Sequence, residues 1–483
     1  MTADDQGNLA VVVGGGVAGL VAARELAIRG LRPLVLEAWA APGGAVGRHT
    51  VAGLVLDAGA DSFATRGGIV AALATELGLG QQITPPSGAG AWVQLPTGAG
   101  TLPRTGLLGI PAHPWAPDVR RTIGLLGALR ASADRWLPAA RGTVRRDGTA
   151  ASLGALVATR MGRRVLDRLV TPVISGVHAA DPNELAVDAV APGLRAELAA
   201  RGSLGAAVVA MRALAPAGSA VAGLTGGMHT LVDALVADIR AHGGQVETGA
   251  RVVAIENAAP SGWTVHVAES SGAAQRVIST QRLMLALPGP AAADLLTPHV
   301  PALAAARPAP GADVVLATLV LDAPALDAAP RGTGVLVAPG TCGVRAKALT
   351  HATAKWAWLA CAAGPGRHVL RLSYGQAPAA ARSATDIAGL TLAELTAVAL
   401  RDAGTLLGVP LDVSQVVQSA RVRWSQSLPK PSPAQHATVA AARAGVAVLP
   451  ALAVCGAWVA GNGLAAVVAD ARAAGSSLAQ GRD

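Results

Sequence analysis

The stretch LAVVVGGGVAGLVAARELAIRGLRPLVLE, which runs from Leu9 to Glu37, decides the fold. It opens with a short uninterrupted apolar run, as a buried parallel strand does. Helical periodicity follows over residues 17–29, and a second apolar run over residues 31–36 ends in the acidic residue. Between the first run and the helix stand three glycines in the G-x-G-x-x-G spacing: Gly14, Gly16 and Gly19. The stretch therefore predicts a βαβ unit with a glycine-rich turn.

Each residue type in this turn has a physical role in dinucleotide binding. Gly14 permits the tight turn, Gly16 lets the backbone approach a pyrophosphate, and Gly19 allows close packing of helix on strand. The free N–H groups and the positive dipole end at the helix N-terminus attract phosphates. Glu37 can accept hydrogen bonds from a ribose hydroxyl and would repel a 2′-phosphate. We therefore expect a dinucleotide site, the alternative being an ordinary glycine-rich turn.

A second glycine pair indicates which dinucleotide is bound, FAD or NAD. Gly43-Gly44 begins six residues after Glu37, and Arg48 follows it. The alternation over residues 51–56 predicts a strand pair that closes at Asp57. A glycine pair in this place is similar to the extended FAD fingerprint of glutathione-reductase-type flavoproteins, whereas an NAD dehydrogenase would continue into its next helix. The pattern favours FAD over the alternative of a surface hairpin.

The composition excludes several classes of protein. With 52% hydrophobic and 14% charged residues among 483, the chain is too apolar to be disordered. It has nine Trp but one Tyr and one Phe, so chemistry that needs a tyrosine pair is excluded. The net charge of +9 permits an anionic partner without naming it, and we expect no nucleic acid. Three widely spaced cysteines support neither a disulfide framework nor a zinc site, so no metal is expected.

Compartment and membrane signals are weak. The N-terminus MTADDQGN lacks the basic and apolar regions of a secretory signal, and the sparse cysteines fit a reducing compartment. Residues 445–469 carry no charge and are long enough to cross a bilayer, but they contain Pro450 and Asn462 and four glycines. We interpret this segment as a buried strand over residues 446–450 and the start of a later helix. The expected location is cytoplasmic, with at most peripheral membrane contact.

An arginine-rich region spans residues 120–168. It holds eleven arginines against three acidic residues: Arg120, Arg121, Arg130, Arg135, Arg141, Arg145, Arg146, Arg160, Arg163, Arg164 and Arg168 against Asp134, Asp147 and Asp167. The functional interpretation is a basic helical subdomain for an anionic substrate or membrane surface. The alternative is a solvated face in a chain that is rich in arginine throughout.

Together these segments predict an α/β (α+β) fold. We expect a discontinuous Rossmann-type FAD-binding domain of glutathione-reductase/amine-oxidase type from residues 1–85, 220–300 and 415–483. A helical, arginine-rich subdomain over residues 86–219 and an inserted mixed-sheet substrate domain over residues 301–414 complete the predicted organisation.

With these blocks in hand, the sequence resembles the oxygen-dependent protoporphyrinogen/coproporphyrinogen oxidase family, within the flavin-dependent amine oxidase superfamily. The resemblance covers nearly the whole chain, and the version found in high-GC Gram-positive bacteria is the most similar. The motifs that carry it are GGGVAGLVAARELA, APGGAVGRH, DAGADSF, RMGRRVLDRLVTPVISGVHAADPNELAV, GGMHTLVDAL, RLMLALPGPAAADLL, RWSQSLPK and CGAWVAGNGLAA.

The resemblance implies a set of FAD contacts. Pyrophosphate and ribose would be held by Gly14, Gly15, Gly16, Val17, Ala18, Gly19, Glu37 and Ala38. The residues expected around the flavin ring are Gly44, Ala45, Arg48, Gly59, Ala60, Asp61, Ser62 and Trp424. Val252 would meet the adenine side through its backbone. Asn462, Gly463 and Leu464, at a helix N-terminus, would face the pyrimidine end, where the dipole stabilises negative charge on the reduced ring.

Three positions depart from the family pattern. Relatives usually carry a lysine or larger residue at Ala45, often a tyrosine at Val459, and a glycine at Ala471. These departures put details of the packing around the flavin in doubt, but they do not affect FAD binding itself.

The resemblance implies six-electron oxidation of a porphyrinogen in three hydride transfers to FAD, which O2 reoxidises with release of H2O2. No catalytic side chain is nominated, because the flavin carries the redox chemistry. Arg160, His178 and Tyr374 are candidate substrate neighbours, and a structural role is the alternative for each. The arginine-rich region favours coproporphyrinogen III, with four propionates, over protoporphyrinogen IX, with two.

Other functions and partners stay open at this stage. An amine oxidase, a carotenoid desaturase and a non-catalytic porphyrin carrier are the rival functions. A transient contact with ferrochelatase and a monomeric or homodimeric state are further expectations.

Overall fold

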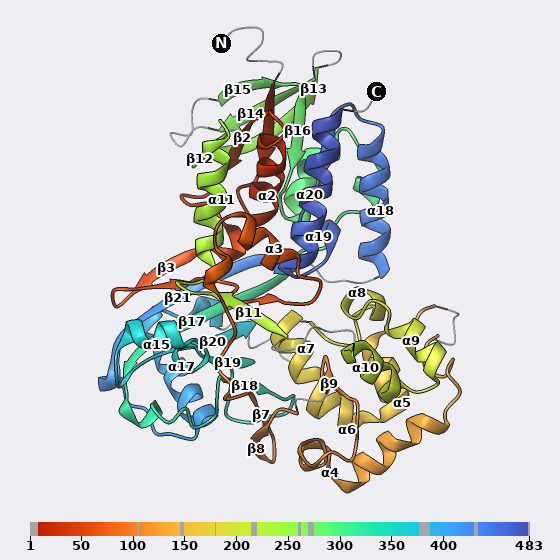
Figure 1. The fold of residues 1–483 in the computed structure, drawn as a ribbon, viewed down its shortest axis with the longest axis vertical. Helices are drawn as coiled ribbons and strands as arrows, with labels where there is room; N and C mark the ends of the chain where they lie inside the picture. Colours follow the sequence, from red (N-terminus) through yellow and green to blue (C-terminus); the bar gives the residue numbers. More distant parts are fainter. Residues whose placement is uncertain are drawn as a thin grey trace.

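Figure 1 shows the computed structural model of the chain as a ribbon. The structure describes residues 8–103, 106–144, 149–178, 180–213, 220–258, 262–268, 275–375, 387–428 and 433–481. Three parts are visible: a layered domain at the top, which also holds both termini, a second sheet at the lower left and a group of helices at the lower right.

A five-stranded parallel sheet forms the centre of the upper domain, in the order β12-β2-β1-β16-β22. Its strands are β1 (Leu9–Val13), β2 (Arg32–Glu37), β12 (Gln245–Thr248), β16 (Arg282–Leu285) and β22 (Leu452–Val454). Side chains along β1 point alternately to the two faces of the sheet. Ala10 and Val12 pack in one hydrophobic core and Val11 and Val13 in another, so both faces are buried. The parallel pairing of β1 with β2 confirms the predicted βαβ unit.

Different layers cover the two faces of this sheet. One layer consists of α2 (Val17–Ala27), α3 (Ile69–Glu76), α11 (His229–Ala241) and α20 (Leu464–Gln480). The other contains the antiparallel strands β13 (Arg251–Asn257), β14 (Trp263–Ala268) and β15 (Gln275–Thr280), with α12 (Gly289–Leu296), α13 (Ala302–Ala305) and α18 (Pro433–Ala447). This is the three-layer arrangement of a Rossmann-type nucleotide-binding domain.

The uncharged segment 445–469 is divided among α18, β22, α19 (Ala457–Ala460) and α20. The prediction of a strand over residues 446–450 is wrong, because α18 continues to Ala447 and β22 begins only at Leu452. A short continuous apolar run has no period that separates helix from strand, which explains the error. Within the described ranges, no helix has both the length and the hydropathy to span a membrane.

The second sheet has seven strands in the order β21-β17-β20-β19-β18-β7-β8. Their bounds are β7 (Trp92–Leu95), β8 (Gly98–Thr101), β17 (Ala312–Asp322), β18 (Gly334–Val337), β19 (Ala348–His351), β20 (Arg367–Gly375) and β21 (Val416–Leu428). Only the β7–β18 pair among them is parallel. One face packs against α17 (Leu392–Leu407), which begins with a capping box of Thr391 and Glu394.

This pairing differs from the expected domain boundaries at two places. Strands β7 and β8 were expected in the helical subdomain, and β21 was expected in the FAD-binding domain. Both belong to the seven-stranded sheet, because hydrogen bonding across a sheet joins segments that are far apart in the chain. The remaining boundaries stay predictions.

The helical part has its own apolar core. It contains α4 (Pro117–Ser132), η3 (Ala133–Trp136), α5 (Leu153–Met161), α6 (Arg163–Val165), a π-helical turn η4 (Leu166–Val170), α7 (Thr171–His178), α8 (Val187–Val190), α9 (Leu194–Arg201) and α10 (Leu204–Ala213). It meets the seven-stranded sheet where Gly176 faces Leu336 of β18. A Cβ at Gly176 would lie 2.6 Å from the Leu336 Cδ2, so a larger residue there would require the Leu336 side chain to move.

Short elements connect the three parts. In the upper domain they are η1 (Gly44–Val46), the hairpin β3 (Arg48–Val51) with β4 (Leu54–Asp57), and the small sheet of β5 (Phe63–Ala64), β6 (Ile83–Thr84) and β11 (Val221–Leu224), with η2 (Gly80–Gln82). Elsewhere they are β9 (Gly106–Leu107), β10 (Ile110–Pro111), η5 (Pro324–Leu326), α14 (Ala352–Lys355), α15 (Ala357–Ala363) and η6 (Val413–Gln415).

Candidate functional site

The glycine turn between β1 and α2 has the geometry that a phosphate cradle needs. A Cβ at Gly14 would lie 2.5 Å from the Ala286 carbonyl oxygen, and one at Gly19 would lie 1.9 Å from the Gly14 oxygen. These two positions therefore require glycine for packing. At Gly16, by contrast, no atom lies within 4 Å of the Cβ position, so the space beside the N-terminus of α2 is open. The first N–H groups of α2 can donate into that space.

Glu37 is held at the end of β2 beside this turn. Its two carboxylate oxygens accept hydrogen bonds from the Gly15 N–H at 2.7 Å and the Trp39 N–H at 2.8 Å. Two of the roughly four acceptor positions of a carboxylate are thereby used, which leaves others for a ribose hydroxyl. The Ala250 N–H donates to the Glu37 carbonyl at 2.8 Å, so the start of β13, with Val252, lies next to the same strand end.

The second glycine pair joins the first turn directly. The Gly43 N–H donates to the Gly15 carbonyl at 2.8 Å, which joins the two glycine segments by backbone. The next loop is joined in turn, because the Ala60 N–H donates to the Ala45 carbonyl at 2.8 Å. A Cβ at Gly59 would lie 2.1 Å from that same carbonyl, so this contact requires glycine. The structure thus brings the expected residues of 44–45 and 59–62 together.

Trp424 reaches this loop from the seven-stranded sheet. Its indole Nε1–H donates to the Ala58 carbonyl at 2.8 Å, across 366 positions of chain. The contact fixes β21 against the loop at Ala58, next to Gly59. The expected position of Trp424 beside the flavin ring stays a prediction.

The N-terminus of α20 opens at the same end of the domain as that of α2. A Cβ at Gly456, before α20, would lie 3.6 Å from the Cβ of Ala18, in the first turn of α2. Near the other end of α20, a Cβ at Gly475 would lie 2.8 Å from the Cβ of Glu25. The two helices therefore run parallel, side by side in Figure 1, and their positive dipole ends lie at the same end of the domain. Gly463 is the residue directly before α20.

Asp61 is the centre of an ionic cluster that connects the loop to the seven-stranded sheet. The Lys355 Nζ lies 3.0 Å from both carboxylate oxygens of Asp61, and an Arg371 nitrogen lies 3.9 Å from one of them. Arg371 also donates to the Gly59 carbonyl. We call these three residues the Asp61 cluster. The exposed fractions of their side chains are 12–18%, so the cluster is close to solvent but largely buried.

The charges of the Asp61 cluster do not balance. Two cations share one carboxylate, which leaves a net charge of +1 at the loop. Burial alone would raise the pKa of Asp61, but the Lys355 ammonium and the Arg371 guanidinium lower that pKa well below its usual range. Asp61 therefore stays ionised, and the surplus positive charge is available to an anionic group.

Arg371 points to the face of the sheet that meets the loop. Side chains alternate along β20, so Leu370 and Leu372 face the core against α17 and Arg371 faces the opposite side. The same opposite face carries Val314 and Leu316 of β17, packed with Trp424. A largely apolar sheet face with one cluster of surplus positive charge therefore borders the loop.

Sequence analysis included Asp61 but missed Lys355 and Arg371. Two signals could have found them. Lys355 is one of three lysines among 39 basic residues, and Arg371 stands inside an otherwise apolar strand pattern, HVLRLSYG. Neither signal says that the two side chains meet Asp61, since about 300 residues separate them from it.

Arg160, expected as a substrate neighbour, has a structural role instead. It is fully buried, its Nε lies 2.5 Å from an oxygen of Asp134, and its remaining N–H groups donate to backbone carbonyls that include those of Pro138 and Gly202. Every donor is used inside the helical part, so the substrate interpretation of Arg160 is wrong.

Tyr374 is likewise buried away from the loop. It is 1% exposed, and its hydroxyl donates to Asp402 of α17 at 3.2 Å. Burial and the Asp402 carboxylate raise the pKa of Tyr374 above its usual value. It lies on the α17 side of the sheet, opposite to Arg371, so its expected substrate contact is also wrong. The side chain of His178 lies outside the described residues.

Other arginines of the region 120–168 also bind the protein itself. Arg130 donates to the carbonyls of Thr159 and Arg160, Arg164 to that of Ile123, and Arg168 to that of Thr122. These contacts hold α4 against its neighbours. They remove part of the argument for a basic substrate surface, while Arg145 and Arg146 lie outside the described residues.

Arg48 has a partner other than the loop. Its guanidinium lies 2.7 Å from Asp233 of α11, and both side chains are more than half exposed. The expected cofactor contact of Arg48 therefore has no support in this geometry.

Comparison with known proteins identifies the family. The model of the flavin containing amine oxidoreductases matches residues 17–481. The chain belongs to this family. It is a flavin-dependent oxidoreductase, and the open cradle at Gly16, the two parallel helix N-termini and the fixed Glu37 fit such a cofactor. The residues assigned to individual cofactor contacts remain predictions.

Curated relatives from mycobacteria are similar over nearly the whole chain. A coproporphyrinogen III oxidase of Mycobacterium bovis is 32% identical over 480 residues, which cover 98% of this chain and 97% of the relative. The protein of the same name from Mycobacterium leprae is 30% identical and covers 95% of this chain and 96% of its own.

Solved structures share the fold. A structure from Exiguobacterium sp. 255-15, which its name places with the protoporphyrinogen oxidases, superposes with a TM-score of 0.81 at 22% identity, over 99% of both chains. Cyclohexylamine oxidase from Brevibacterium oxydans gives a TM-score of 0.63 at 16% identity, over 98% of this chain and 99% of its own. At these identities the likeness concerns the fold, which confirms the predicted architecture.

Proposed function

We propose that this chain oxidises coproporphyrinogen III to coproporphyrin III, with FAD as its flavin and O2 as the electron acceptor. The observation that carries the proposal is the similarity to coproporphyrinogen III oxidases over 98% of the chain at 32% identity. The match includes all three parts of the fold, so it covers the nucleotide-binding elements and the sheet face that borders them.

The residues of this chain have separable roles in the proposed reaction. The Gly16 cradle and the two helix N-termini would hold the pyrophosphate and ribose, with Glu37 as acceptor. The Asp61 cluster would attract a propionate through its surplus charge, since Lys and Arg donate strong charge-assisted hydrogen bonds to carboxylates. The apolar sheet face beside Arg371 would exclude water from the macrocycle.

The flavin supplies the redox step. When bound, FAD provides a two-electron acceptor that O2 regenerates, so the six-electron oxidation consumes three O2 and releases three H2O2. The protein contributes position, dryness and charge, and no side chain is assigned as a base.

Protoporphyrinogen IX is the second candidate substrate. The solved structure with the highest TM-score reported above carries the name of a protoporphyrinogen oxidase. The preference for the four-propionate substrate also has less support than the arginine content alone indicated, because Arg130, Arg160, Arg164 and Arg168 bind protein carbonyls.

Aerobic turnover of the purified, FAD-loaded protein tests the proposal. Freshly reduced coproporphyrinogen III and protoporphyrinogen IX are supplied in parallel, and porphyrin fluorescence and H2O2 are measured. We expect faster turnover of coproporphyrinogen III, with three H2O2 per porphyrin. Faster turnover of protoporphyrinogen IX would favour the second candidate, and stoichiometric FAD without turnover of either would contradict the oxidase assignment and favour a porphyrin carrier.

A further inference from the structure

The outward face of α4 is apolar, although the outward face of a surface helix is ordinarily polar. The inward face packs Ala128 and Ala131 into the core of the helical part. Four large apolar side chains of α4 and η3 instead keep more than half of their surface in solvent. They are Leu125 (61% exposed), Leu126 (67%), Leu129 (56%) and Trp136 (74%), and we call them the α4 patch.

A kink in α4 presents this patch to solvent. Gly124 interrupts the helix with φ 75° and ψ 170°, a conformation that favours glycine. The helix resumes directly after it, so Leu125 and Leu126 stand in a first turn, and Leu129 follows four positions after Leu125 on the same side. In Figure 1, α4 lies at the bottom of the helical part, at the end of the molecule opposite to both termini. The patch therefore protrudes at one end of the fold.

Positive charge lies directly beside the α4 patch. The guanidinium carbon of Arg135 is 5.6 Å from the centroid of the Trp136 ring. Arg164 crosses the kink, where its Nη1 donates to the Ile123 carbonyl at 3.4 Å and lies 3.4 Å from the Cβ position of Gly124. A carbonyl is a neutral partner, so this hydrogen bond leaves the charge of Arg164 uncompensated.

The surrounding segments add further positive charge. The elements α4, η3, α6 and η4 hold seven arginines and three acidic residues: Arg120, Arg121, Arg130, Arg135, Arg163, Arg164 and Arg168, with Asp118, Asp134 and Asp167. Asp134 is buried and paired with Arg160. In the described part of the chain, none of the seven arginines forms an ion pair with a carboxylate. The patch is thus an apolar surface with a basic rim.

This charge favours an anionic occupant over a second copy of the chain. Two copies that met through the α4 patch would bring their arginine rims together, and like charges across an interface cost affinity. A bilayer that contains acidic lipids offers the complement of both features. Leucine and tryptophan side chains enter the boundary between headgroups and acyl chains, and arginines reach the lipid phosphates.

We propose that the α4 patch docks the protein on an anionic lipid bilayer, with its leucines and Trp136 inserted and the surrounding arginines on the headgroups. Insertion would reach about 5–10 Å, the depth typical of interfacial helices. This docking surface lies in the helical part, away from the Asp61 cluster, and it does not depend on which porphyrinogen the enzyme oxidises.

Vesicle binding tests the proposal with the full-length, FAD-loaded protein. Co-sedimentation is measured with vesicles of phosphatidylcholine alone and with vesicles that contain about one third phosphatidylglycerol. We expect binding to the anionic vesicles that is at least about tenfold tighter than to the neutral ones. It should be lost in about 1 M salt, where the Debye length falls to about 3 Å. Equal binding to both vesicles, or to neither, would contradict the proposal.

Substitutions in the α4 patch separate insertion from general attraction. Leu125→Ser, Leu126→Ser and Leu129→Ser together should weaken binding to anionic vesicles at least about tenfold, because three exposed apolar side chains no longer insert. The matched control is Val413→Ser with Val448→Ser, which are 69% and 82% exposed outside the helical part and should leave binding unchanged. Unchanged binding in the triple variant would overturn the proposal.

A charge variant tests the arginine rim. Arg135→Gln should weaken binding to anionic vesicles about fivefold, the effect of one arginine near an acidic surface. Arg240→Gln, an exposed arginine at the end of α11, is the control and should bind as the unmodified protein does. Equal losses in the two variants would show that net charge alone, and not the rim of the patch, drives binding.

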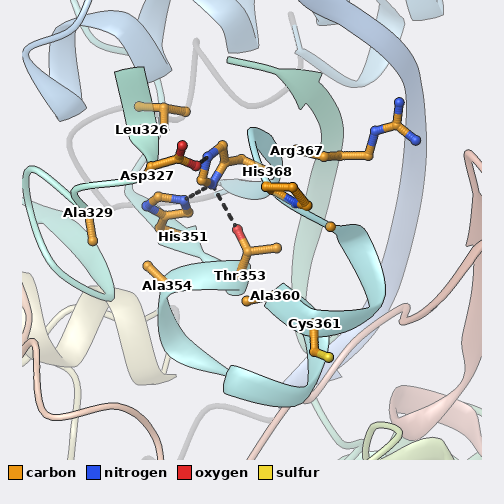
Figure 2. Close-up of a pocket in the computed structure, with 12 residues that line it drawn as sticks. Leu326, Asp327, Ala329, His351, Thr353, Ala354, Ala360, Cys361, Arg367 and His368 are labelled. Carbon is orange, nitrogen blue, oxygen red and sulfur yellow. Dashed lines mark hydrogen bonds and ion pairs between the residues drawn. The ribbon is translucent and has the colours of Figure 1, made fainter. Parts of the chain in front are cut away.

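Fluorescent labels test which side faces the membrane. Figure 2 shows Cys361, an exposed residue of α15 on the seven-stranded sheet, which serves as the distant labelling site. An environment-sensitive dye is attached there in Cys342→Ser protein, or at position 129 in Leu129→Cys protein that lacks both exposed native thiols. We expect anionic vesicles to shift the emission to the blue only at position 129. A shift at both positions, or only at Cys361, would contradict docking through α4.

Sedimentation velocity without vesicles distinguishes the alternative occupant. We expect the protein to keep one sedimentation coefficient as its concentration rises, and the triple leucine variant to behave in the same way. A dimer that forms with concentration and disappears in the triple variant would overturn the proposal and assign the patch to a second copy of the chain.

Discussion

Two ionic clusters built around arginine differ in how completely their cations are satisfied. In the helical part, one cation meets one carboxylate: Arg160 pairs with Asp134, its other donors bind carbonyls, and its side chain has no exposed surface. In the Asp61 cluster, Lys355 and Arg371 share a single carboxylate, and each side chain keeps 12–15% exposure.

The degree to which the donors of an arginine are satisfied distinguishes a structural arginine from one that can bind a ligand. A saturated, fully buried guanidinium has no donor left, so its removal affects folding. A partly exposed cluster with one surplus positive charge can still accept an anion, so its loss should affect substrate binding more than stability. Arginine content by itself does not distinguish the two cases.

The largest expected effect is on stability in the helical part. Arg160→Met leaves the Asp134 carboxylate buried without its charge partner, and we expect a loss of about 3–5 kcal/mol in the free energy of unfolding. Urea denaturation measures this. The control is Arg135→Met on the exposed side of η3, which should cost less than about 1 kcal/mol. If Arg160→Met lost as little unfolding free energy as the control, the structural role of Arg160 would be contradicted.

The second effect is on activity. Arg371→Met should lower kcat/KM for coproporphyrinogen III roughly tenfold, since one charge-assisted hydrogen bond is lost. The loss of stability should be smaller than for Arg160→Met, because Asp61 keeps Lys355. Arg367→Met, four positions earlier in the same strand, is the matched control, and its kcat/KM should stay at the wild-type value. Unchanged turnover in Arg371→Met would contradict a substrate role for the cluster.

A third effect concerns acid stability. The folded-state pKa of Asp61 is lowered, so the native protein binds fewer protons than the unfolded chain, and Asp61 adds stability above its unfolded pKa of about 3.9. That contribution is lost as the pH falls below this value. Asp61→Asn should therefore differ most from wild type near neutral pH, and the gap in Tm should close in acid. A gap that is constant between pH 6 and 3 would show that Asp61 is not held ionised by its partners.

The smallest effect is expected at Arg48. Its ion pair with Asp233 is more than half exposed, so Arg48→Ala should change the free energy of unfolding by less than about 1 kcal/mol. The FAD content of the purified variant should equal that of wild type. Loss of FAD from this variant would restore the cofactor contact that sequence analysis expected and the geometry does not support.

Much of the nucleotide domain was predictable because its signals are local. The turn at Gly14–Gly19, the second glycine pair and the strands around them follow from spacing within short segments. The structure adds that the two glycine segments are joined by the hydrogen bond from the Gly43 N–H to the Gly15 carbonyl.

The rest depends on contacts that spacing does not encode. Lys355 and Arg371 meet Asp61 across about 300 residues, and β7 joins β18 across about 240. Arg160 was misassigned because the carbonyls that satisfy it come from separate turns, including those at Pro138 and Gly202. A count of charges cannot show which arginines already donate all their hydrogen bonds to groups of the protein.

One ratio tests the central claim, that the surplus charge of the Asp61 cluster serves the carboxylates of the substrate. It is the kcat/KM for coproporphyrinogen III divided by that for protoporphyrinogen IX, measured in wild type and in Lys355→Met under the same aerobic conditions. We predict that the ratio exceeds one in wild type and falls severalfold toward one in the variant, because the cluster loses its surplus charge. An unchanged ratio in a folded, FAD-loaded Lys355→Met protein would contradict the claim.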